Sequence, residues 1–127
     1  MSIGRIAMLS AITDAAAGRK AEDIVALDVR EVSSFTDTFF VATGTSDRHV
    51  RSVADAIQAA LSELGESPLG IEGYDEGRWV LIDYGATIVH IFQHETRINY
   101  DLERLWSDAL TIELIHTPIR SPHSGVQ

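Results

Sequence analysis

The amino-acid sequence predicts an α/β (α+β) fold, in which helices flank one mixed β-sheet. Three observations predict it: two segments carry apolar residues at helical spacing, short β-rich runs separate and follow them, and glycines mark the junctions. The elements follow the order α-β-β-α-β-β-α, which implies a sheet with helices on its faces. The 127 residues are the length of one domain. We expect this domain to span residues 1–112.

The first half of the chain alternates helix and strand patterns. Apolar residues in segment 3–17 recur every three or four positions, which predicts an amphipathic helix that ends at Gly18. The runs Ile24–Val29 and Thr38–Thr43 are rich in β-branched and aromatic residues and therefore predict two strands. Because only a short polar segment separates them, we expect the two strands to form an antiparallel pair.

A turn at Gly44-Thr45-Ser46 follows the second strand and leads into the clearest helix of the sequence. Ser46 is a good N-cap residue, and Asp47 complements the positive end of the helix dipole. The helix is expected to end at Gly65. Its apolar residues fall on one stripe that faces a core: Val50, Val53, Ala54, Ile57, Leu61 and Leu64.

The second half of the chain begins with a polar loop over residues 65–77. A hairpin follows, in which the runs 79–84 and 87–92 are joined by a tight turn at Gly85-Ala86. Both runs are apolar at nearly every position, so we expect both faces of these strands to be covered.

The chain is expected to end in a helix and a tail. The helix runs from about Glu95 or Asn99 to Asp108 and turns aromatic and leucine side chains toward the core. Proline, serine and glycine accumulate after it, so we expect residues 113–127 to form a flexible tail.

Composition excludes several classes of function. The chain has 10 Lys and Arg against 19 Asp and Glu, so its net charge of −9 excludes a general basic surface for nucleic acid. An acidic surface instead favours a basic partner, or keeps the protein soluble. There is no cysteine, which excludes disulfides, thiolate catalysis and cysteine-based zinc sites. The apolar runs are too short to span a membrane and no signal pattern is present, so we expect a cytoplasmic location.

The turn at Gly44-Thr45-Ser46 has two interpretations. A helix N-terminus can bind phosphate, but the segment lacks both glycine-rich nucleotide-binding patterns, and an ordinary capped turn also explains it. A strand, such a turn and a helix also occur in nucleotidyltransferase folds, whose metal ions need several carboxylates. Here Asp83 is a single carboxylate, so we expect no enzyme activity and no cofactor. A nucleotidyltransferase-like, nucleotide-binding enzyme is the alternative hypothesis.

The hairpin brings a possible acid–base pair together. If Gly85-Ala86 is a two-residue turn, Asp83 and His90 are diagonal neighbours on one face. Such a pair can orient a general base, or its members can satisfy each other, and no placed nucleophile accompanies them. His90 and His94 would share a face only in a helix, so we expect no metal site. The face in question carries Trp79, Leu81, Asp83, Ile88, His90 and Phe92.

Large amphipathic side chains are the other candidates for function. Trp, Tyr and Arg are the residue types most enriched at protein–protein hot spots. Trp106 lies at helical spacing among apolar residues and fits a core position. Trp79 follows a glycine-rich acidic loop at the start of a strand, where a core and an interface position are equally compatible with the sequence.

Five motifs, in order and with matching spacing, resemble the ribosomal silencing factor family, also called the RsfS or Iojap-like family. The resemblance covers about residues 5–110. The motifs are Thr43–Val50, Glu72-Gly73, Trp79–Gly85, Val89–Phe92 and Arg97–Trp106. Ala86 stands where the family often has aspartate, so one acidic group is absent at the hairpin tip. Asn99 stands where the family frequently has an aromatic or charged residue.

The resemblance implies a nucleotidyltransferase-like shape without the catalysis of those enzymes. It further implies a translational repressor that binds the large ribosomal subunit through its subunit-interface protein L-fourteen. The bound factor would sterically block joining of the small subunit and lower translation under nutrient limitation. A homodimer is also implied, and a structural dimer module with another partner is a competing hypothesis. The residues expected to contact the ribosomal protein are Trp79, Asp83, Tyr84, His90, Arg97 and Tyr100.

The negative charge is concentrated in one part of the sequence. Between Arg51 and Arg78 there is no basic residue, and six carboxylates fall there: Asp55, Glu63, Glu66, Glu72, Asp75 and Glu76. We expect them on the solvent side of the long helix and in the loop before Trp79. There they would form an acidic approach to an aromatic anchor, with a merely solvated face as the alternative.

Overall fold

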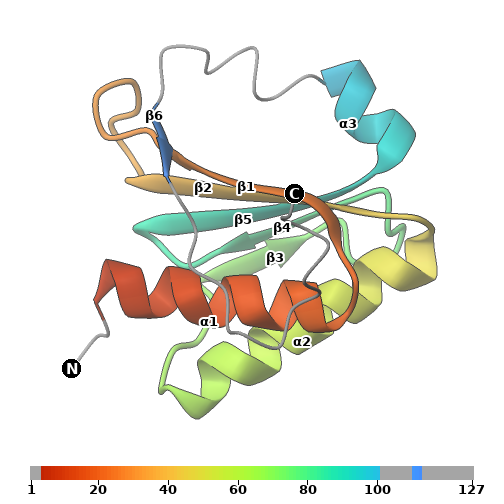
Figure 1. Cartoon of the computed structure of the whole chain (residues 1–127), viewed down its shortest axis with the longest axis horizontal. Helices are drawn as coiled ribbons and strands as arrows, with labels where there is room; N and C mark the ends of the chain where they lie inside the picture. Colours follow the sequence, from red (N-terminus) through yellow and green to blue (C-terminus); the bar gives the residue numbers. More distant parts are fainter. Residues whose placement is uncertain (1–3, 101–109, 113–127) are drawn as a thin grey trace, which may run out of the picture.

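The computed structural model of the chain describes residues 4–100 and 110–112 (Figure 1). The order predicted from the sequence is confirmed, and two short strands, β3 and β6, are added to it. The expected tail at 113–127 and the predicted helical residues 101–108 lie outside the described residues. The elements are α1 (Arg5–Gly18), β1 (Glu22–Asp28), β2 (Thr38–Gly44), α2 (Asp47–Glu63), β3 (Gly70–Glu72), β4 (Trp79–Asp83), β5 (Thr87–Gln93), α3 (His94–Tyr100) and β6 (Leu110–Ile112).

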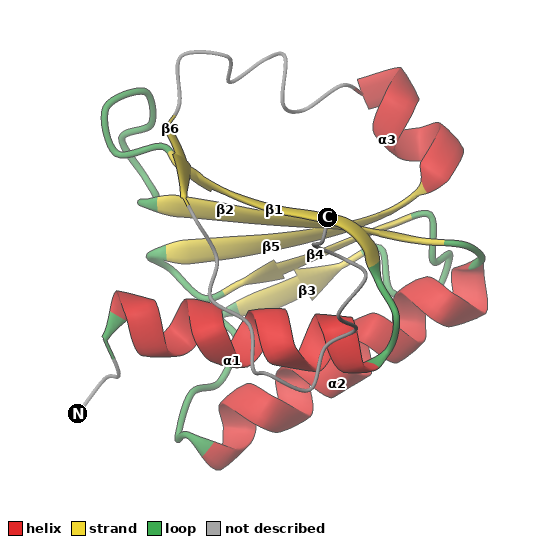
Figure 2. Cartoon of the chain, viewed as in Figure 1, coloured by secondary structure: helices red, strands yellow, loops and turns green. Residues whose placement is uncertain are grey.

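The strands form one six-stranded mixed sheet in the order β3-β4-β5-β2-β1-β6 (Figure 2). The pairs β1–β2 and β4–β5 are antiparallel, as predicted, whereas β2 and β5 run parallel at the centre. The long connection between β2 and β5, which contains α2, allows this parallel pairing. β2 is buried along its whole length, as a central strand covered on both faces should be.

The hairpin has the predicted register. Trp79 pairs with Phe92 and Asp83 with Ile88, so the turn contains the two expected residues. Gly85 has a φ of +86°, a conformation in which a residue without Cβ carries no steric penalty. This register decides which hairpin side chains share a face, and it therefore sets the composition of the site.

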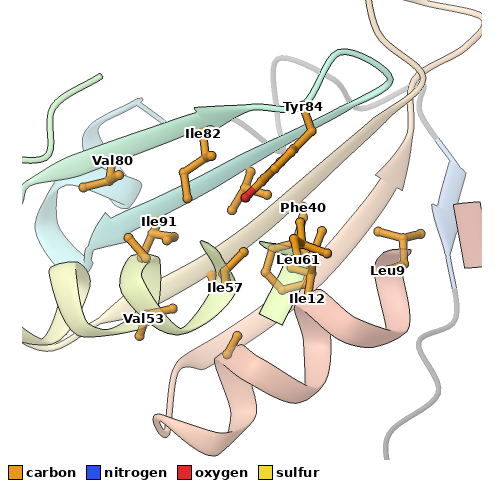
Figure 3. Close-up of a cluster of buried hydrophobic side chains, with 14 of the residues drawn as sticks. Leu9, Ile12, Phe40, Val53, Ile57, Leu61, Val80, Ile82, Tyr84 and Ile91 are labelled. Atoms are coloured by element: carbon orange, nitrogen blue, oxygen red, sulfur yellow. The ribbon is translucent and has the colours of Figure 1, made fainter. Parts of the chain in front are cut away.

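Both long helices cover the same face of the sheet, whereas α3 lies on the other side (Figure 1). Residues of α1 and α2 pack with one face of the strands in a single core (Figure 3). Phe40, Ile57 and Ile82 are among its fully buried members. The helical spacing of the apolar residues in α2 produces this arrangement, because one stripe of the helix meets the sheet.

The opposite face of the sheet carries a second apolar cluster. Its buried members are Leu27, Val29, Phe39, Val41, Ile88 and Phe92, and Trp79 and Leu81 pack against it partly buried. His90 lies on the same face, where its ring contacts Phe39 and Phe92. Because side chains alternate along a strand, Val80, Ile82 and Tyr84 point to the helices instead.

Two edge strands, β3 and β6, were not predicted from the sequence. β3 lies inside the segment expected to be a polar loop, and it pairs antiparallel with β4. β6 pairs antiparallel with β1 at the other edge. Each has three residues, and those of β3 are all exposed, so neither leaves an alternating pattern in the sequence. Among the described residues, no helix combines the length and apolar content needed to cross a bilayer.

Candidate protein-binding surface

The loop that leads to Trp79 is a tight, glycine-dependent turn. The N–H of Gly77 donates to the carbonyl of Gly73 at 3.0 Å, and the two glycines have φ values of +71° and +79°. A Cβ at Gly77 would lie 2.7 Å from Cβ of Asp47 in α2. The loop therefore sits against the start of α2 with no room for a side chain at this position.

Side chains of α2 and β5 hold this loop in place. Arg51 Nη1 donates to the carbonyl of Asp75 at 3.0 Å, and the Tyr74 hydroxyl donates to Asp55 Oδ1 at 2.9 Å. From β5, Gln93 Nε2 donates to the carbonyl of Gly77 at 2.9 Å. The acidic segment before Trp79 is thus fixed by side-chain hydrogen bonds, although it contains no regular element after β3.

Trp79 is the first residue of β4 and is half-buried. Its ring lies over Phe92, with centroids 4.9 Å apart and planes inclined by 30°. Its indole Nε1–H donates to Nδ1 of His90 at 3.1 Å. The indole is therefore packed and hydrogen-bonded on its inner side, and Trp79 also lines a groove at the surface.

His90 is buried behind Trp79, with 4% of its surface exposed. The imidazole lies edge-on to Phe39, at a centroid distance of 4.9 Å, and parallel to Phe92 at 6.0 Å. Burial lowers the pKa of His90 to about 4, so the ring is neutral at physiological pH. Since Nδ1 accepts the indole proton, Nε2 must carry the imidazole hydrogen.

Asp83 and His90 do not form the pair suggested by the sequence. Asp83 Oδ1 accepts the N–H of Gly85 at 2.7 Å, and His90 Nδ1 accepts from Trp79. The two-residue turn explains the difference, because it leaves the Gly85 N–H within reach of the carboxylate two residues earlier. Asp83 therefore stabilises the hairpin turn, at the opposite end of β4 from Trp79.

Tyr84 lies on the other face of the sheet from Trp79, Asp83 and His90. It is 9% exposed and belongs to the core between the sheet and the helices (Figure 3). Burial raises the pKa of the Tyr84 hydroxyl to about 12, and the negative charge of Glu66 adds to the shift. Alternation along β4 is the physical reason for its position.

Arg97 braces α3 against the sheet. Its Nη1 donates to the carbonyl of Asp23 in β1 and to Oγ1 of Thr43 in β2, both at 2.7 Å. Asp23 has a φ of +49° at the irregularity between Glu22 and Val25, so the bond falls where the strand departs from regular pairing. Tyr100 is the last residue of α3, and its side chain lies outside the described part of the chain.

A groove opens beside Trp79, between the acidic loop and α3. Its volume is about 410 Å³, and its lining is formed by Gly73, Glu76, Arg78, Trp79, Thr96 and Asn99. We call it the Trp79 groove. Of these lining residues, only Trp79 was predicted from the sequence as a contact. The others come from the loop and from α3, which are separated in the sequence by β4 and β5 and come together only in the folded chain. The sequence signal closest to this groove is the pair of glycines that flanks Asp75 and Glu76, the second of them two residues before Trp79.

The turn at Gly44-Thr45-Ser46 is a capped helix start. Ser46 Oγ accepts the N–H of His49 at 3.0 Å, and the N–H of Thr45 donates to His49 Nδ1 at 2.8 Å. Gly44 pairs with Gln93 at one end of β5, whereas Asp83 pairs with Ile88 near the other. Five strand residues correspond to roughly 16 Å. The two features considered for nucleotidyltransferase chemistry therefore do not form one site.

The buried imidazole predicts a stability change with pH. The pKa of His90 is below the ordinary value of about 6.5, so the unfolded chain binds this proton first as pH falls. The contribution of the neutral His90 ring to the unfolding free energy is intact above pH 7 and is lost as pH falls toward 4. We expect about 2 kcal/mol less unfolding free energy at pH 5 than at pH 8 from this residue. Urea unfolding of wild type and His90→Leu at both values measures it; equal pH dependence in both would contradict it.

The topology and the Trp79 groove define the class of protein: a small α+β domain that presents a groove lined by one tryptophan and polar side chains, beside an acidic loop. Within residues 4–100 and 110–112, no three histidine, aspartate or glutamate side chains form a group that could hold a metal ion. The chain belongs to the ribosomal silencing factor family. The family model described as "Ribosomal silencing factor during starvation" matches residues 4–125, which confirms the resemblance seen in the motifs.

Individual relatives agree with this assignment. Ribosomal silencing factor RsfS of Bacillus subtilis is 42% identical over 96 residues, which cover 76% of this chain and 81% of that protein. RsfS of Haemophilus influenzae is 38% identical and covers 80% of this chain and 100% of its own. A crystal structure of a Chromobacterium violaceum protein has a TM-score of 0.77 at 37% identity, covering 84% of this chain and 88% of that one. The family assigns a ribosome-associated silencing role.

Proposed function

We propose that this protein binds the large ribosomal subunit through protein L-fourteen, using the Trp79 groove, and blocks joining of the small subunit. Silencing then needs only occupancy, with no bond made or broken. The observation that carries the proposal is the half-buried Trp79, held at a groove next to an acidic loop. Its physiological effect is lower translation under nutrient limitation. The protein acts in the cytoplasm, and a homodimer is a second state that we expect in solution.

The aromatic anchor supports binding because it is preorganised. A tryptophan that is fixed before binding loses little side-chain entropy when a partner covers it. Here Phe92 supports the ring plane and His90 accepts the indole proton. Tryptophan at the centre of an interface is also the residue type whose truncation costs most affinity. We therefore place the energetic centre of the interface at Trp79.

The six residues proposed as contacts divide into different roles. Trp79, Asp83 and Arg97 are partly accessible. Tyr84 and His90 are buried, so we propose that they act by supporting the surface rather than by touching the ribosomal protein. Tyr100 remains a proposed contact at the end of α3. To these we add Glu76, Arg78, Thr96 and Asn99, which line the groove around Trp79.

The acidic loop supports a basic partner. Glu72, Asp75 and Glu76 are all exposed, and Glu76 lines the groove, in a chain whose net charge is −9. Exposed charges of this kind steer encounter and fix orientation more than they add affinity. A basic ribosomal protein would therefore be attracted to the side of the molecule that carries Trp79.

The effect of the acidic loop on binding can be separated from the effect of the net charge. We expect Asp75→Asn/Glu76→Gln to weaken binding to large subunits roughly two- to tenfold at low salt, and to reduce its salt dependence. Glu31→Gln/Glu63→Gln makes the same change in net charge at exposed positions away from the groove. Co-sedimentation with purified large subunits across a salt series measures both. An equal effect of the two variants would assign the steering to net charge alone.

The partner itself is tested with purified components. We expect wild-type protein to sediment with large subunits but not with small ones, and to bind isolated L-fourteen. Retained binding to large subunits from which L-fourteen has been removed would contradict L-fourteen as the partner. Absence of binding to intact large subunits would contradict the proposal as a whole.

A further inference from the structure

We propose that His90 is a positioning residue, which selects the orientation of the Trp79 indole that a partner meets. The inference rests on the proposed function, in which Trp79 is the anchor of the interface. It replaces the earlier expectation of a direct contact, because 4% exposure leaves His90 almost no surface for a partner. His90 therefore acts on binding through Trp79 alone.

Two different contacts determine two different properties of the indole. Packing on Phe92, at 4.9 Å and 30°, sets the plane of the ring. This packing does not distinguish the two orientations of the indole that differ by a half-turn about the Cβ–Cγ bond. Aromatic side chains can adopt both orientations. The hydrogen bond from Trp79 Nε1 to His90 Nδ1, at 3.1 Å, does distinguish them.

The selected orientation has a chemical consequence at the surface. The indole N–H, the single polar group of the side chain, is directed inward to a buried acceptor. A partner that covers Trp79 then meets carbon atoms and does not have to desolvate or satisfy an N–H. In the flipped orientation the N–H would face the partner, and an unmatched donor would be buried on binding.

The arrangement is unfavourable for the fold taken by itself. Because Nδ1 is the acceptor, Nε2 carries the hydrogen, and Nε2 is buried without a hydrogen-bond partner. The ring is surrounded by Phe39 and Phe92, beside which an apolar side chain would leave no unsatisfied donor. A buried donor without a partner, such as Nε2–H of His90, is rare in folded proteins and needs an explanation. The requirement for an acceptor at Nδ1, which receives the indole N–H, supplies one.

Substitutions of His90 are expected to change the unfolding free energy and the affinity for large subunits in different directions. At pH 8, His90→Leu is expected to be as stable as wild type or more stable, yet to bind large subunits roughly three- to tenfold more weakly. His90→Asn keeps an acceptor near the position of Nδ1, so it is expected to recover much of the affinity despite lower stability. Ile88→Val, on the same strand and face, is the control and should leave affinity unchanged.

The orientation of Trp79 is measured separately from binding. In a ¹⁵N-labelled protein the indole N–H resonance of Trp79, identified by its loss in Trp79→Phe, reports the hydrogen bond to His90. We expect it to shift and to exchange faster in His90→Leu, and to return toward its wild-type position in His90→Asn. Trp106 supplies a second indole resonance as an internal reference.

Three results would overturn the inference. They are an unchanged indole resonance in His90→Leu, wild-type affinity in that variant, or affinity losses that simply follow stability across all three variants. If wild type does not bind large subunits, the proposed function fails. The indole resonance and the unfolding free energies then still decide whether His90 positions Trp79.

Discussion

Replacing Gly73 with alanine is expected to displace Trp79 and to reduce binding to the large subunit below detection. A Cβ at Gly73 would lie 2.0 Å from the backbone oxygen of Trp79 and 3.2 Å from its carbonyl carbon. Both are main-chain atoms, so the overlap cannot be relieved by rotating a side chain. The start of β4 or the loop must move, and Trp79 moves with it. The φ of +79° adds about 1–2 kcal/mol of strain for any residue with a Cβ.

Gly65→Ala is the matched control for this variant. Gly65 has a similar φ of +85°, but a Cβ there would meet no atom within 4 Å. We expect it to lose about 1–2 kcal/mol of unfolding free energy and to bind large subunits like wild type. Gly73→Ala should lose at least about 1 kcal/mol more. Urea unfolding and co-sedimentation compare the two; similar losses in both assays would show that the overlap with Trp79 has no special effect.

Truncating the anchor itself has the second large effect. Trp79→Ala is expected to weaken binding to large subunits by at least about 2 kcal/mol, roughly 30-fold, as for a tryptophan at the centre of an interface. Trp79→Phe, which can keep the contact with Phe92 but has no N–H, should fall between wild type and alanine. The affinity series is read by titrating large subunits with labelled protein.

Phe35→Ala is the control for loss of an exposed aromatic ring. Phe35 is 68% exposed in the loop between β1 and β2, away from the Trp79 groove, and we expect its truncation to leave affinity unchanged. Because Trp79 also packs on Phe92, each variant is first checked for cooperative unfolding. A folded Trp79→Ala that binds like wild type would remove Trp79 from the interface.

The local parts of the fold were predictable from the sequence. The hairpin register followed from the two-residue turn at Gly85, and α2 followed from one apolar stripe and the cap at Ser46. The edge strands β3 and β6 were not predictable, since three residues carry no period and their pairing depends on distant partners. That α1 and α2 share one face of the sheet is likewise a property of the assembled topology.

The candidate site was predictable only in part. Residue type and the preceding loop singled out Trp79, and alternation placed His90 on its face. The pairing of Asp83 with His90 was wrong, because the Gly85 N–H is a nearer donor for the carboxylate. The groove residues Arg78, Thr96 and Asn99 could not be predicted from the sequence. Arg78 precedes β4 and the other two lie in α3, and they line one groove only because the fold brings α3 beside the loop.

A direct assay of subunit joining tests whether occupancy of the large subunit by this protein prevents joining. Purified large and small subunits are mixed under conditions that favour joining, with increasing amounts of wild-type protein or Trp79→Ala, and joined particles are separated by sedimentation. We expect wild type to reduce joined particles in proportion to its occupancy of large subunits, and Trp79→Ala to need at least about 30-fold more protein. Undiminished joining with large subunits saturated by wild-type protein would contradict this expectation.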